Sequence, residues 1–385
     1  MLFDFAVIGL GAVGSQAARV LAQRGHSVVG IDALHPPHES GSHHGHPRML
    51  RESCYAGTPY LDLVREAREQ WSRLQALTGR SLIEQTEALL IGPPESGTYG
   101  GTLASAARSA PARGWRHLAS GEIREMFPFL RPPAHHAALL ESDGGLLNPD
   151  ACIEATLGLC GQAGAELWFG QPVLDWQTGK GSVTVETPDR RFRARRVLLV
   201  PGPSAAGQLA RAALALRIQR TVQHWTRPGA TEPGISAAEV RGRWPAWVWE
   251  HYPGRSWYGF PPGPLGVKVG LHLGNDRHCA NRKHELGKTA ATTAETEAME
   301  QVLGEFAPPL SGGLYRSAAC SYSMTPDHNF ILDRHPDCRR VFLFAGGSGH
   351  AFKFAPVLGR MLADLASDRQ DGPGTAPFRL SRFAN

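Results

Sequence analysis

The sequence has few lysines and no long apolar run, and each shortage excludes a class of protein. Lysine occurs at only five positions, so the formal charge of +5 comes from arginines spread along the chain rather than from a basic block. A nucleic-acid groove is therefore poorly supported, because such grooves need clustered basic side chains. A membrane span needs about 20 consecutive apolar residues. We expect no nucleic-acid partner and no membrane association.

The six cysteines are dispersed and form no CxxC pair. This pattern fits neither a disulfide framework nor a zinc ribbon, and it indicates a reducing compartment. The apolar N-terminus lacks a positively charged start and a cleavage site, so it does not resemble a signal peptide. We expect a cytoplasmic protein in which Cys152 and Cys160 are packing residues.

What the chain does have is length and an ordinary balance of residue types. Of its 385 residues, 42% are hydrophobic and 19% are charged. This length exceeds what one hydrophobic core usually supports, and the composition is that of a globular protein. We therefore expect two domains and room for a large ligand.

The first residues carry a dinucleotide-binding fingerprint. The segment FDFAVIGLGAVGSQAARVLAQRGHSVVGID predicts a strand, a glycine turn, a helix and a second strand. Gly9, Gly11 and Gly14 form the GxGxxG pattern that lets a pyrophosphate approach the N-terminus of the helix. Asp32 ends the second strand, where a carboxylate can accept hydrogen bonds from ribose hydroxyls. The fingerprint predicts a bound dinucleotide but does not separate NAD from FAD.

Five histidines crowd the loop that follows, HPPHESGSHHGHPRMLR. A metal site is disfavoured, because the loop has neither a helical histidine pair nor a cysteine at ligand spacing, and its arginines would repel a cation. The loop glycines instead allow Ser42, His43 and His44 to lie against a flat ligand. If the next piece turns helically, Arg48 and Arg51 lie on one side of it and can address a carboxylate or a flavin. Solvated surface arginines are the alternative.

These motifs resemble those of the monomeric sarcosine oxidase and N-methyltryptophan oxidase family of flavin amine oxidases. The resemblance is carried by GLGAVG, by PPHESGSHHGHPRMLR and by segments farther along, and it spans nearly the full chain. It implies a glutathione-reductase-like fold of the DAO family with FAD as the cofactor. It also implies that Arg48 takes part in flavin binding and catalysis, and that Arg51 binds the substrate carboxylate.

A predicted antiparallel sheet from about residue 216 onward carries three further residues that match the family. Alternating patterns and aromatic residues suggest strands with one face on a cavity. In GVKVGLHLG, Lys268 and His272 point to the same face, and valines flank the lysine. The resemblance implies that Lys268 activates oxygen and that Tyr258 and His272 shape the substrate site, with Tyr258 also contacting the substrate. An edge-strand lysine and satisfied core side chains are the alternatives.

The segment CSYSMTPDHNFILD places Cys320 at the head of a polar stretch. A packed thiol is the alternative here, because free cysteines usually behave as small hydrophobes. In the resembling family the cysteine of this motif carries FAD through a thioether, which implies an 8α-S-cysteinyl link at Cys320. The chemistry needs a thiolate beside the flavin, and we expect an exposed turn to bring Cys320 there.

The motif RRVFLFAGGSGHAFKFAPVLGRMLADL predicts a buried strand, a glycine loop and a helix. Gly346, Gly347 and Gly349 let the main chain approach a ring, and the helix N-terminus favours an anionic one. We assign His350 to the same cofactor site. The resemblance implies that Lys353 contacts the cofactor region and, with Arg51, clamps the substrate carboxylate.

The sequence as a whole predicts an α/β flavoprotein with two interleaved domains. Residues 1–85, 150–215 and 324–385 are assigned to a Rossmann-type FAD-binding domain. Residues 86–149 and 216–323 are assigned to a mixed-sheet substrate domain.

The predicted activity is oxidation of an N-methyl (secondary) amino acid, such as N-methyl-L-tryptophan or sarcosine, by a monomer that uses molecular oxygen. The products are the primary amino acid, formaldehyde and hydrogen peroxide. Rivals are a related oxidase or dehydrogenase acting on a cyclic imino acid or glycated amino acid, and a flavin- or NAD-binding protein without turnover. The chain departs from the family pattern at ESCYAG after Arg51 and at GPS from Gly202 to Ser204, which leaves the acyl pocket and one local contact open.

Overall fold

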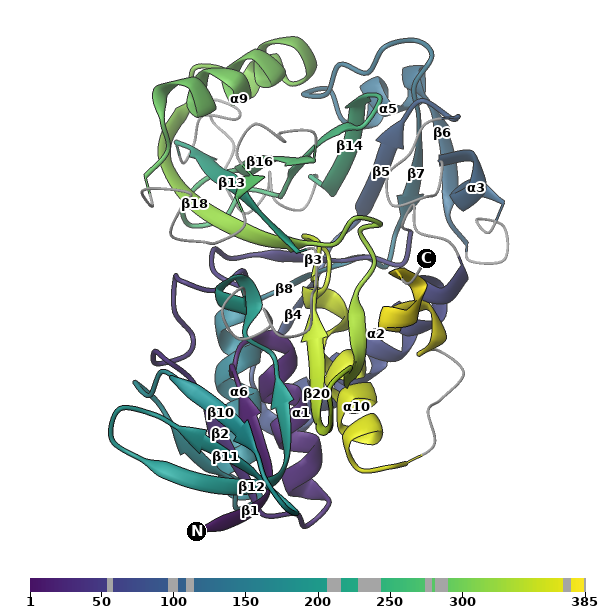
Figure 1. The fold of residues 1–385 in the computed structure, drawn as a ribbon. Coiled ribbons are helices and arrows are strands. Elements are labelled where there is room, and N and C mark those ends of the chain that lie inside the picture. Colours follow the sequence, from purple (N-terminus) through teal and green to yellow (C-terminus); the bar gives the residue numbers. More distant parts are fainter. Residues whose placement is uncertain are drawn as a thin grey trace.

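The computed structural model describes residues 1–53, 58–95, 103–108, 114–205, 216–227, 244–273, 279–280, 290–369 and 375–383. In this part of the chain the molecule has two lobes with a small three-stranded sheet between them (Figure 1). One lobe contains an eight-stranded sheet, and the other contains a nine-stranded sheet. Within the described ranges, no helix combines the length and the apolar character that a membrane crossing requires.

The eight-stranded sheet has a parallel centre. Strands β9, β2, β1, β12 and β20 are parallel neighbours in that order, β11 and β10 continue the sheet beside the first half of β12, and β19 is antiparallel to β20. The strand bounds are β1 (Leu2–Ile8), β2 (Val28–Ile31), β9 (Glu166–Trp168), β10 (Asp175–Thr178), β11 (Val183–Glu186), β12 (Arg191–Leu199), β19 (Ile331–His335) and β20 (Cys338–Ala345). Parallel strands need long crossovers, and this arrangement confirms the predicted Rossmann-type fold.

From Phe5 to Ile8, successive residues of β1 enter two different cores, as the period of a strand dictates. Phe5 and Val7 pack against the helices, whereas Ala6 and Ile8 pack on the side of β10 and β11. Phe3, at the start of the strand, departs from this alternation and packs with Ala6 and Ile8. The helices of this lobe are α1 (Ala12–Gln23), α2 (Thr58–Thr78), α6 (Pro149–Gln162) and α10 (Ala355–Ala366). All four contribute apolar residues to one core. Because α1 begins directly after the turn that follows β1, this packing holds the helix side of the turn in place.

The helix α6 forms where its cap residues predict it. Asn148 accepts a hydrogen bond from the Ala151 N–H at 3.1 Å, and Pro149 occupies the first turn. Cys152 and Cys160 on this helix are fully buried in the apolar core. Their prediction as packing residues is confirmed.

The nine-stranded sheet is antiparallel except where β14 runs parallel to β5. Its strands are β5 (Ala88–Gly92), β6 (Arg116–Ala119), β7 (Ala137–Glu141), β13 (Arg217–Thr226), β14 (Ala246–Tyr252), β15 (Arg255–Gly259), β16 (Lys268–Leu273), β17 (Cys279–Ala280) and β18 (Leu314–Met324). Trp247, Trp249 and Trp257 are fully buried and pack with Phe306 of α9 (Thr293–Phe306). This aromatic core supports one face of the sheet and leaves the other for the cavity.

The three-stranded sheet consists of β3 (Arg48–Leu50), β4 (Ile83–Gln85) and β8 (Gly145–Leu147), and both outer strands are antiparallel to β8. The helical turn considered for residues 48–51 is therefore wrong for the first three of them. The physical reason is distant in sequence, because β3 finds its backbone partners in β8 and buries Leu50. Short helical segments complete the fold: α3 (Leu103–Ala107), α5 (Ser120–Met126), η1 (Gly202–Ala205), η5 (Pro308–Leu310), η6 (Phe352–Phe354), η7 (Ala376–Phe378) and η8 (Leu380–Phe383).

The division into domains stays a proposal. It is supported by sheet membership, since the strands of segments 1–32, 166–199 and 331–345 form the eight-stranded sheet. The exception is β8, which was assigned to the substrate domain but pairs with β3 and β4.

Candidate active site

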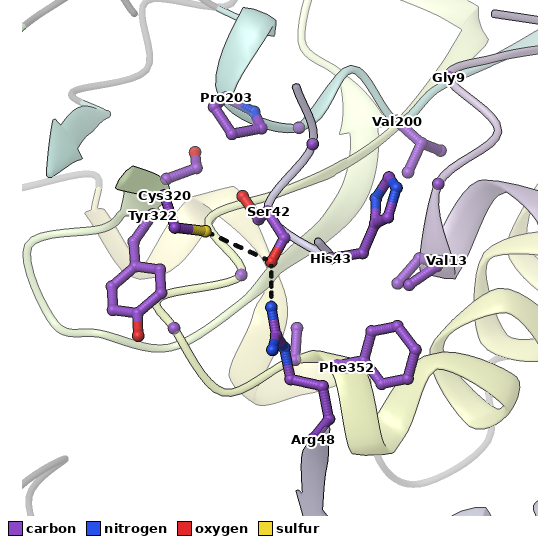
Figure 2. Close-up of a pocket in the computed structure, with 18 of the residues that line it drawn as sticks. Gly9, Val13, Ser42, His43, Arg48, Val200, Pro203, Cys320, Tyr322 and Phe352 are labelled. Atoms are coloured by element: carbon purple, nitrogen blue, oxygen red, sulfur yellow. Dashed lines mark hydrogen bonds between the residues drawn. The ribbon is translucent and has the colours of Figure 1, made fainter. Parts of the chain in front are cut away.

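A cavity of about 340 Å³ extends from the turn after β1 to the face of the nine-stranded sheet. Its lining includes every residue that the sequence assigned to a site except Gly14 and His44. The residues come from segments that are far apart in the sequence, and Figure 2 shows how some of them lie around the histidine-rich loop. The structure thus brings the predicted residues together, while their roles stay predictions.

Glycine is required at two positions of the first turn for reasons inside the protein. Gly9 has a φ of +94°, and a Cβ there would overlap the carbonyl oxygen of Val200 at the end of β12. A Cβ at Gly14 would overlap the carbonyl oxygen of Gly9. At Gly11 the nearest atom to an added Cβ is Nδ1 of His43, at 3.5 Å. The space at Gly11 therefore belongs to the cavity and not to a packed neighbour.

Asp32 stands at the end of β2, beside this turn. Its carboxylate accepts hydrogen bonds from the backbone N–H groups of Leu10 at 2.8 Å and Leu34 at 3.0 Å. Nε2 of His38 lies 3.3 Å from Oδ1. Burial opposes ionisation, but the hydrogen bonds from His38, Leu34 and Leu10 outweigh it and lower the pKa of Asp32. The group is an anion at neutral pH, as a ribose acceptor must be.

The histidine-rich loop is fixed against the second lobe by hydrogen bonds. The Ser42 hydroxyl donates to the Ser321 carbonyl at 2.5 Å, and Nε2 of His44 lies 2.9 Å from the Ala319 carbonyl. Burial, followed by neighbouring charges, lowers the pKa of His43 to about 3 and that of His44 to about 4. Both imidazoles are therefore neutral at pH 7, which suits a loop that already contains an arginine.

Arg48 organises the same loop from the side of β3. Its guanidinium donates to the carbonyls of Ser42, His44, Gly45 and Pro47. Figure 2 shows that the Ser42 carbonyl lies between Arg48 and the sulfur of Cys320. Because both terminal nitrogens of Arg48, Nη1 and Nη2, donate to loop carbonyls, Arg48 shapes the cavity wall chiefly through the loop.

Cys320 lies on β18 and not on an exposed turn. It pairs with Thr221 of β13, its side chain is 4% exposed, and its sulfur lies 3.8 Å from the Ser42 carbonyl oxygen. The expectation of an exposed turn is therefore wrong. The strand continues because residues 314–324 find a ladder partner along nearly all of β13, which a local sequence pattern does not reveal. The thiol nonetheless lines the cavity.

Two cationic side chains line the cavity near the glycine-rich loop after β20. Arg51 is only 7% exposed, and its Nη1 atom has no hydrogen-bond partner among the residues that the structure describes. Lys353 lies in η6, with Nζ 5.0 Å from the ring centroid of Phe354, and its carbonyl accepts a 3.0 Å hydrogen bond from the indole of Trp71. A buried donor without a partner, such as Nη1 of Arg51, is costly. An anionic ligand in the cavity would reduce this cost.

Lys268 is buried against the histidine-rich loop and is 2% exposed. Its ammonium donates to the carbonyls of Gly45 at 2.7 Å and Pro47 at 3.2 Å, and it lies 5.2 Å from the ring centroid of Phe260. Burial, followed by the charge of Arg48, holds the pKa of Lys268 well below its ordinary value. The prediction that Lys268 and His272 share one face of a strand is confirmed, since both line the cavity from β16.

His272 lines the cavity together with two tyrosines, Tyr258 and Tyr322. Its Nδ1 lies 3.3 Å from the Tyr322 hydroxyl, and burial, followed by the charge of Arg51, lowers the pKa of His272 to about 3. Tyr258 stands on the neighbouring strand β15, and burial raises its pKa well above the ordinary value. Gly270 leaves space for it, because an added Cβ would lie 2.5 Å from the Tyr258 hydroxyl. The wall therefore consists of neutral donors and acceptors.

The glycine-rich loop after β20 brings main chain against the same wall, because an added Cβ at Gly349 would lie 2.8 Å from the ring of Tyr322 and 3.0 Å from that of His272. Gly346 and Gly349 have φ values of +65° and +77°, and Ser348 at +46° is stabilised by a 3.0 Å hydrogen bond from its hydroxyl to the Gly346 carbonyl. The ring of His350 lies against Phe330 at 4.5 Å between centroids, and its Nε2 is 3.0 Å from the His328 carbonyl. Gly346, Gly347 and Gly349 of this loop line the cavity.

Comparison with known proteins gives this geometry a family. Residues 4–365 match the family described as FAD dependent oxidoreductase. The chain is 34% identical to monomeric sarcosine oxidase of Streptomyces avermitilis over 94% of this chain and 93% of that protein. It is 33% identical to N-methyl-L-tryptophan oxidase of Salmonella arizonae over the whole of both chains. The chain belongs to this family of FAD-dependent oxidoreductases.

Solved structures agree on the fold of this FAD-dependent oxidoreductase. NikD, an amino acid oxidase of nikkomycin biosynthesis, superposes with a TM-score of 0.83 at 23% identity and covers 98% of this chain and 97% of its own. L-proline dehydrogenase from P. horikoshii gives a TM-score of 0.80 at 20% identity, with 97% and 96% covered. The family resemblance seen in the sequence and the predicted fold class are confirmed.

The residues of the oxidoreductase fit FAD. The open space at Gly11 suits a pyrophosphate at the N-terminus of α1, and the ionised Asp32 suits a ribose. The cavity continues from there to Cys320, Lys268 and the loop at Gly347. FAD would be held by these groups.

Several residues line the cavity that no sequence motif assigned to a site. Tyr322 contacts His272 and lies two positions after Cys320 on β18, so strand periodicity could have assigned both to one face. His38 lines the cavity and contacts Asp32, but nothing in its local sequence indicates that contact. Of the two departures from the family pattern, Gly202 and Pro203 line the cavity in η1, while residues 54–57 of ESCYAG lie outside the described residues.

Proposed function

We propose that this oxidoreductase is an oxidase of N-methyl (secondary) amino acids, such as N-methyl-L-tryptophan or sarcosine. The observation that carries the proposal is the buried guanidinium of Arg51, with one nitrogen unpartnered among the described residues, in a cavity that begins at a dinucleotide turn. The named activities of the 34% and 33% identical relatives support the same substrate class.

The chain's own residues would bind and orient the substrate. Arg51 and Lys353 supply positive charge for a carboxylate, and Arg offers a planar fork that matches it. Tyr258 and Tyr322 wall the space for the side chain, and neutral His272 can accept a hydrogen bond from the amine. Holding both ends of a small amino acid fixes its N-methyl carbon, and such orientation is a large part of many rate accelerations.

The proposed overall reaction balances as amine, oxygen and water giving primary amino acid, formaldehyde and hydrogen peroxide. FAD, when bound, would accept a hydride from the N-methyl carbon and pass two electrons to oxygen. Lys268 would supply positive charge where oxygen gains negative charge, because it is buried and held at the Gly45 and Pro47 carbonyls. Arg48 would support the same wall through the histidine-rich loop.

We also propose a thioether between Cys320 and the flavin 8α carbon. The S–H bond of the thiol and one C–H bond of the 8-methyl group would be broken and the S–C bond formed. The two protons and two electrons released would pass to molecular oxygen, the oxidant of the proposed activity, giving hydrogen peroxide. The support is the position of the thiol in the cavity and the motif that the sequence shares with the family. Acid precipitation followed by peptide mass analysis tests it. Yellow pigment that stays with the peptide containing Cys320 is expected, and pigment released into the supernatant would overturn the link.

The activity is tested by anaerobic mixing of the purified yellow protein with a panel of amines, followed by peroxide detection in air. N-methyl-L-tryptophan and sarcosine should bleach the flavin faster than L-proline or a fructosyl amino acid. Faster reduction by L-proline or the fructosyl compound would instead support the rival substrate classes. A flavin that stays yellow with every member of the panel would remove the oxidase proposal.

The cytoplasmic location and the monomeric state also stay proposals.

A further inference from the structure

Glu141 is a buried carboxylate that the proposed reaction does not use. It ends β7, is 0% exposed and does not line the cavity. Its oxygens accept hydrogen bonds from the Glu52 N–H at 2.8 and 2.9 Å and from the Ser53 N–H at 2.8 Å. Arg68 of α2 adds a contact at 3.3 Å. A charge buried this deeply is normally retained for a reason, because its desolvation is costly.

The partners of Glu141 identify what it holds. Glu52 and Ser53 directly follow Arg51, so the carboxylate fixes the backbone on one side of the proposed substrate-binding arginine. On the other side, Leu50 of β3 pairs with Gly145 of β8. Both supports come from one short stretch, since β7 ends at Glu141 and β8 begins at Gly145. The backbone around Arg51 is thus clamped between the two ends of the β7–β8 connection.

Glu141 achieves this without neutralising the arginine. Among the described residues its ion-pair partner is Arg68, and Nη1 of Arg51 has no hydrogen-bond partner. A carboxylate that paired directly with Arg51 would compete with the substrate for the same cation. The arrangement instead uses backbone N–H groups as the anchor, and Nη1 of Arg51 is left without a partner among the described residues.

We propose that Glu141 is a positioning residue that fixes the orientation of the Arg51 guanidinium and thereby the affinity for the substrate carboxylate. This inference rests on the proposed function, in which Arg51 binds that carboxylate. A chain held at residues 50, 52 and 53 can present the guanidinium in one orientation, and the loss of orientation weakens bidentate recognition more than it weakens the fold.

The test compares Glu141→Gln with Glu250→Gln. Glu250 is an equally buried carboxylate on the same sheet that accepts a 2.8 Å hydrogen bond from the Gly254 N–H, and it does not line the cavity. Calorimetry on each holoenzyme measures binding of indole-3-acetate, a carboxylate with no amine to oxidise, and of indole-3-acetamide, its neutral counterpart. Glu141→Gln should weaken acetate binding about tenfold, equivalent to about 1.4 kcal/mol, and leave acetamide binding unchanged. In turnover, KM for the amino acid should rise by a similar factor with little change in kcat.

The outcomes separate the two proposals. Equal acetate affinities in Glu141→Gln and Glu250→Gln would overturn the positioning role. If Arg51→Gln itself leaves acetate binding unchanged, the carboxylate site at Arg51 fails, and the role of Glu141 fails with it. If Arg51→Gln weakens binding and Glu141→Gln does not, only the positioning role fails. Should Glu141→Gln not fold, Glu141→Asp keeps the charge with a shorter reach, and an acetate affinity equal to that of the wild type would contradict the proposal.

Discussion

The two ends of the cavity are built in different ways. At the dinucleotide end, the turn between β1 and α1 is shaped by main-chain contacts, with Gly14 against Gly9 in the same turn and Gly9 against Val200, which directly follows β12 of the same sheet. At the proposed substrate end, Arg51, Lys268 and the other polar groups arrive on strands and loops from distant parts of the chain. The first end is therefore a main-chain feature of one lobe, and the second exists only once both lobes have folded.

This difference predicts how each end tolerates change. A backbone feature fails when a Cβ is added, whatever the chemistry of the new side chain. A site made of separate side chains loses one function with each substitution, because each side chain can be replaced while the sheets stay folded. Substitutions at the two ends should therefore divide into effects on folding and effects on binding.

The largest effect is expected at Gly14. Gly14→Ala places a methyl group on the Gly9 carbonyl and should give insoluble or flavin-free protein. Gly11→Ala is the matched control, because its Cβ meets only His43 at 3.5 Å. That variant should fold with an unchanged circular dichroism spectrum and a lower flavin content. If Gly14→Ala and Gly11→Ala both purify with a full complement of flavin, the predicted difference between the two glycines is wrong.

The next largest effect is expected at Arg51. Arg51→Gln should raise KM for amino acid substrates about hundredfold, through loss of a charge-assisted contact. Its melting temperature should not fall, since the variant removes a buried cation whose Nη1 has no partner among the described residues. Arg48→Gln should behave in the opposite way, with a lower melting temperature, because four loop carbonyls lose their donor. Steady-state kinetics and thermal melts on both variants measure these effects. A lower melting temperature for Arg51→Gln, or an unchanged one for Arg48→Gln, would contradict the prediction.

A smaller and more selective effect is expected at Lys268. Lys268→Met keeps the length of the side chain and removes its charge, so re-oxidation by oxygen should slow by at least about tenfold. Reduction by substrate should change much less, because the substrate carboxylate is assigned to other cations. Stopped-flow absorbance measures the two half-reactions separately. Re-oxidation at the wild-type rate would show that Lys268 serves only the loop carbonyls.

The smallest difference between the two ends is expected in acid. The pKa of His43 at the dinucleotide end and of His272 at the substrate end is lowered to about 3, below the ordinary value of 6.5. The unfolded chain therefore binds more protons, and stability is lost as the pH falls from about 6.5 toward 3. His43→Asn and His272→Asn should each reduce this slope by at most about 1.4 kcal/mol per pH unit. Urea unfolding from pH 4.5 to 8 measures it, and a stability that is flat below pH 6.5 would contradict both shifts.

The sequence predicted the local parts of this molecule well. The strand, turn and helix around Gly9 depend on residues that are neighbours in the chain, and so does the capping of α6 by Asn148. The aromatic strands from β13 to β16 were predicted from alternation and aromatic residues. In each of these cases the pattern that forms the element lies within the element.

The errors occurred where the partner was distant. Arg48 lies on a strand because β8 pairs with β3 across nearly a hundred residues of sequence, and Cys320 lies on a strand because β18 follows β13. The carbonyl contacts that use the donors of Arg48 depend on the folded shape of the loop, which no residue pattern specifies. Lining residues such as Tyr322 could have been found, but the contact between His38 and Asp32 could not.

The placement of Cys320 on β18 has a consequence for how the proposed thioether would arise. A thiol on a flexible arm could search for its target, whereas this one is held in an eleven-residue strand that pairs with β13 along nearly its whole length. Bond formation would then have to wait until the isoalloxazine had already docked in its final pose. FAD would therefore bind first without a covalent bond, and the thioether would form afterwards. Until the thioether has formed, the newly made polypeptide should exchange its FAD with free FAD in solution.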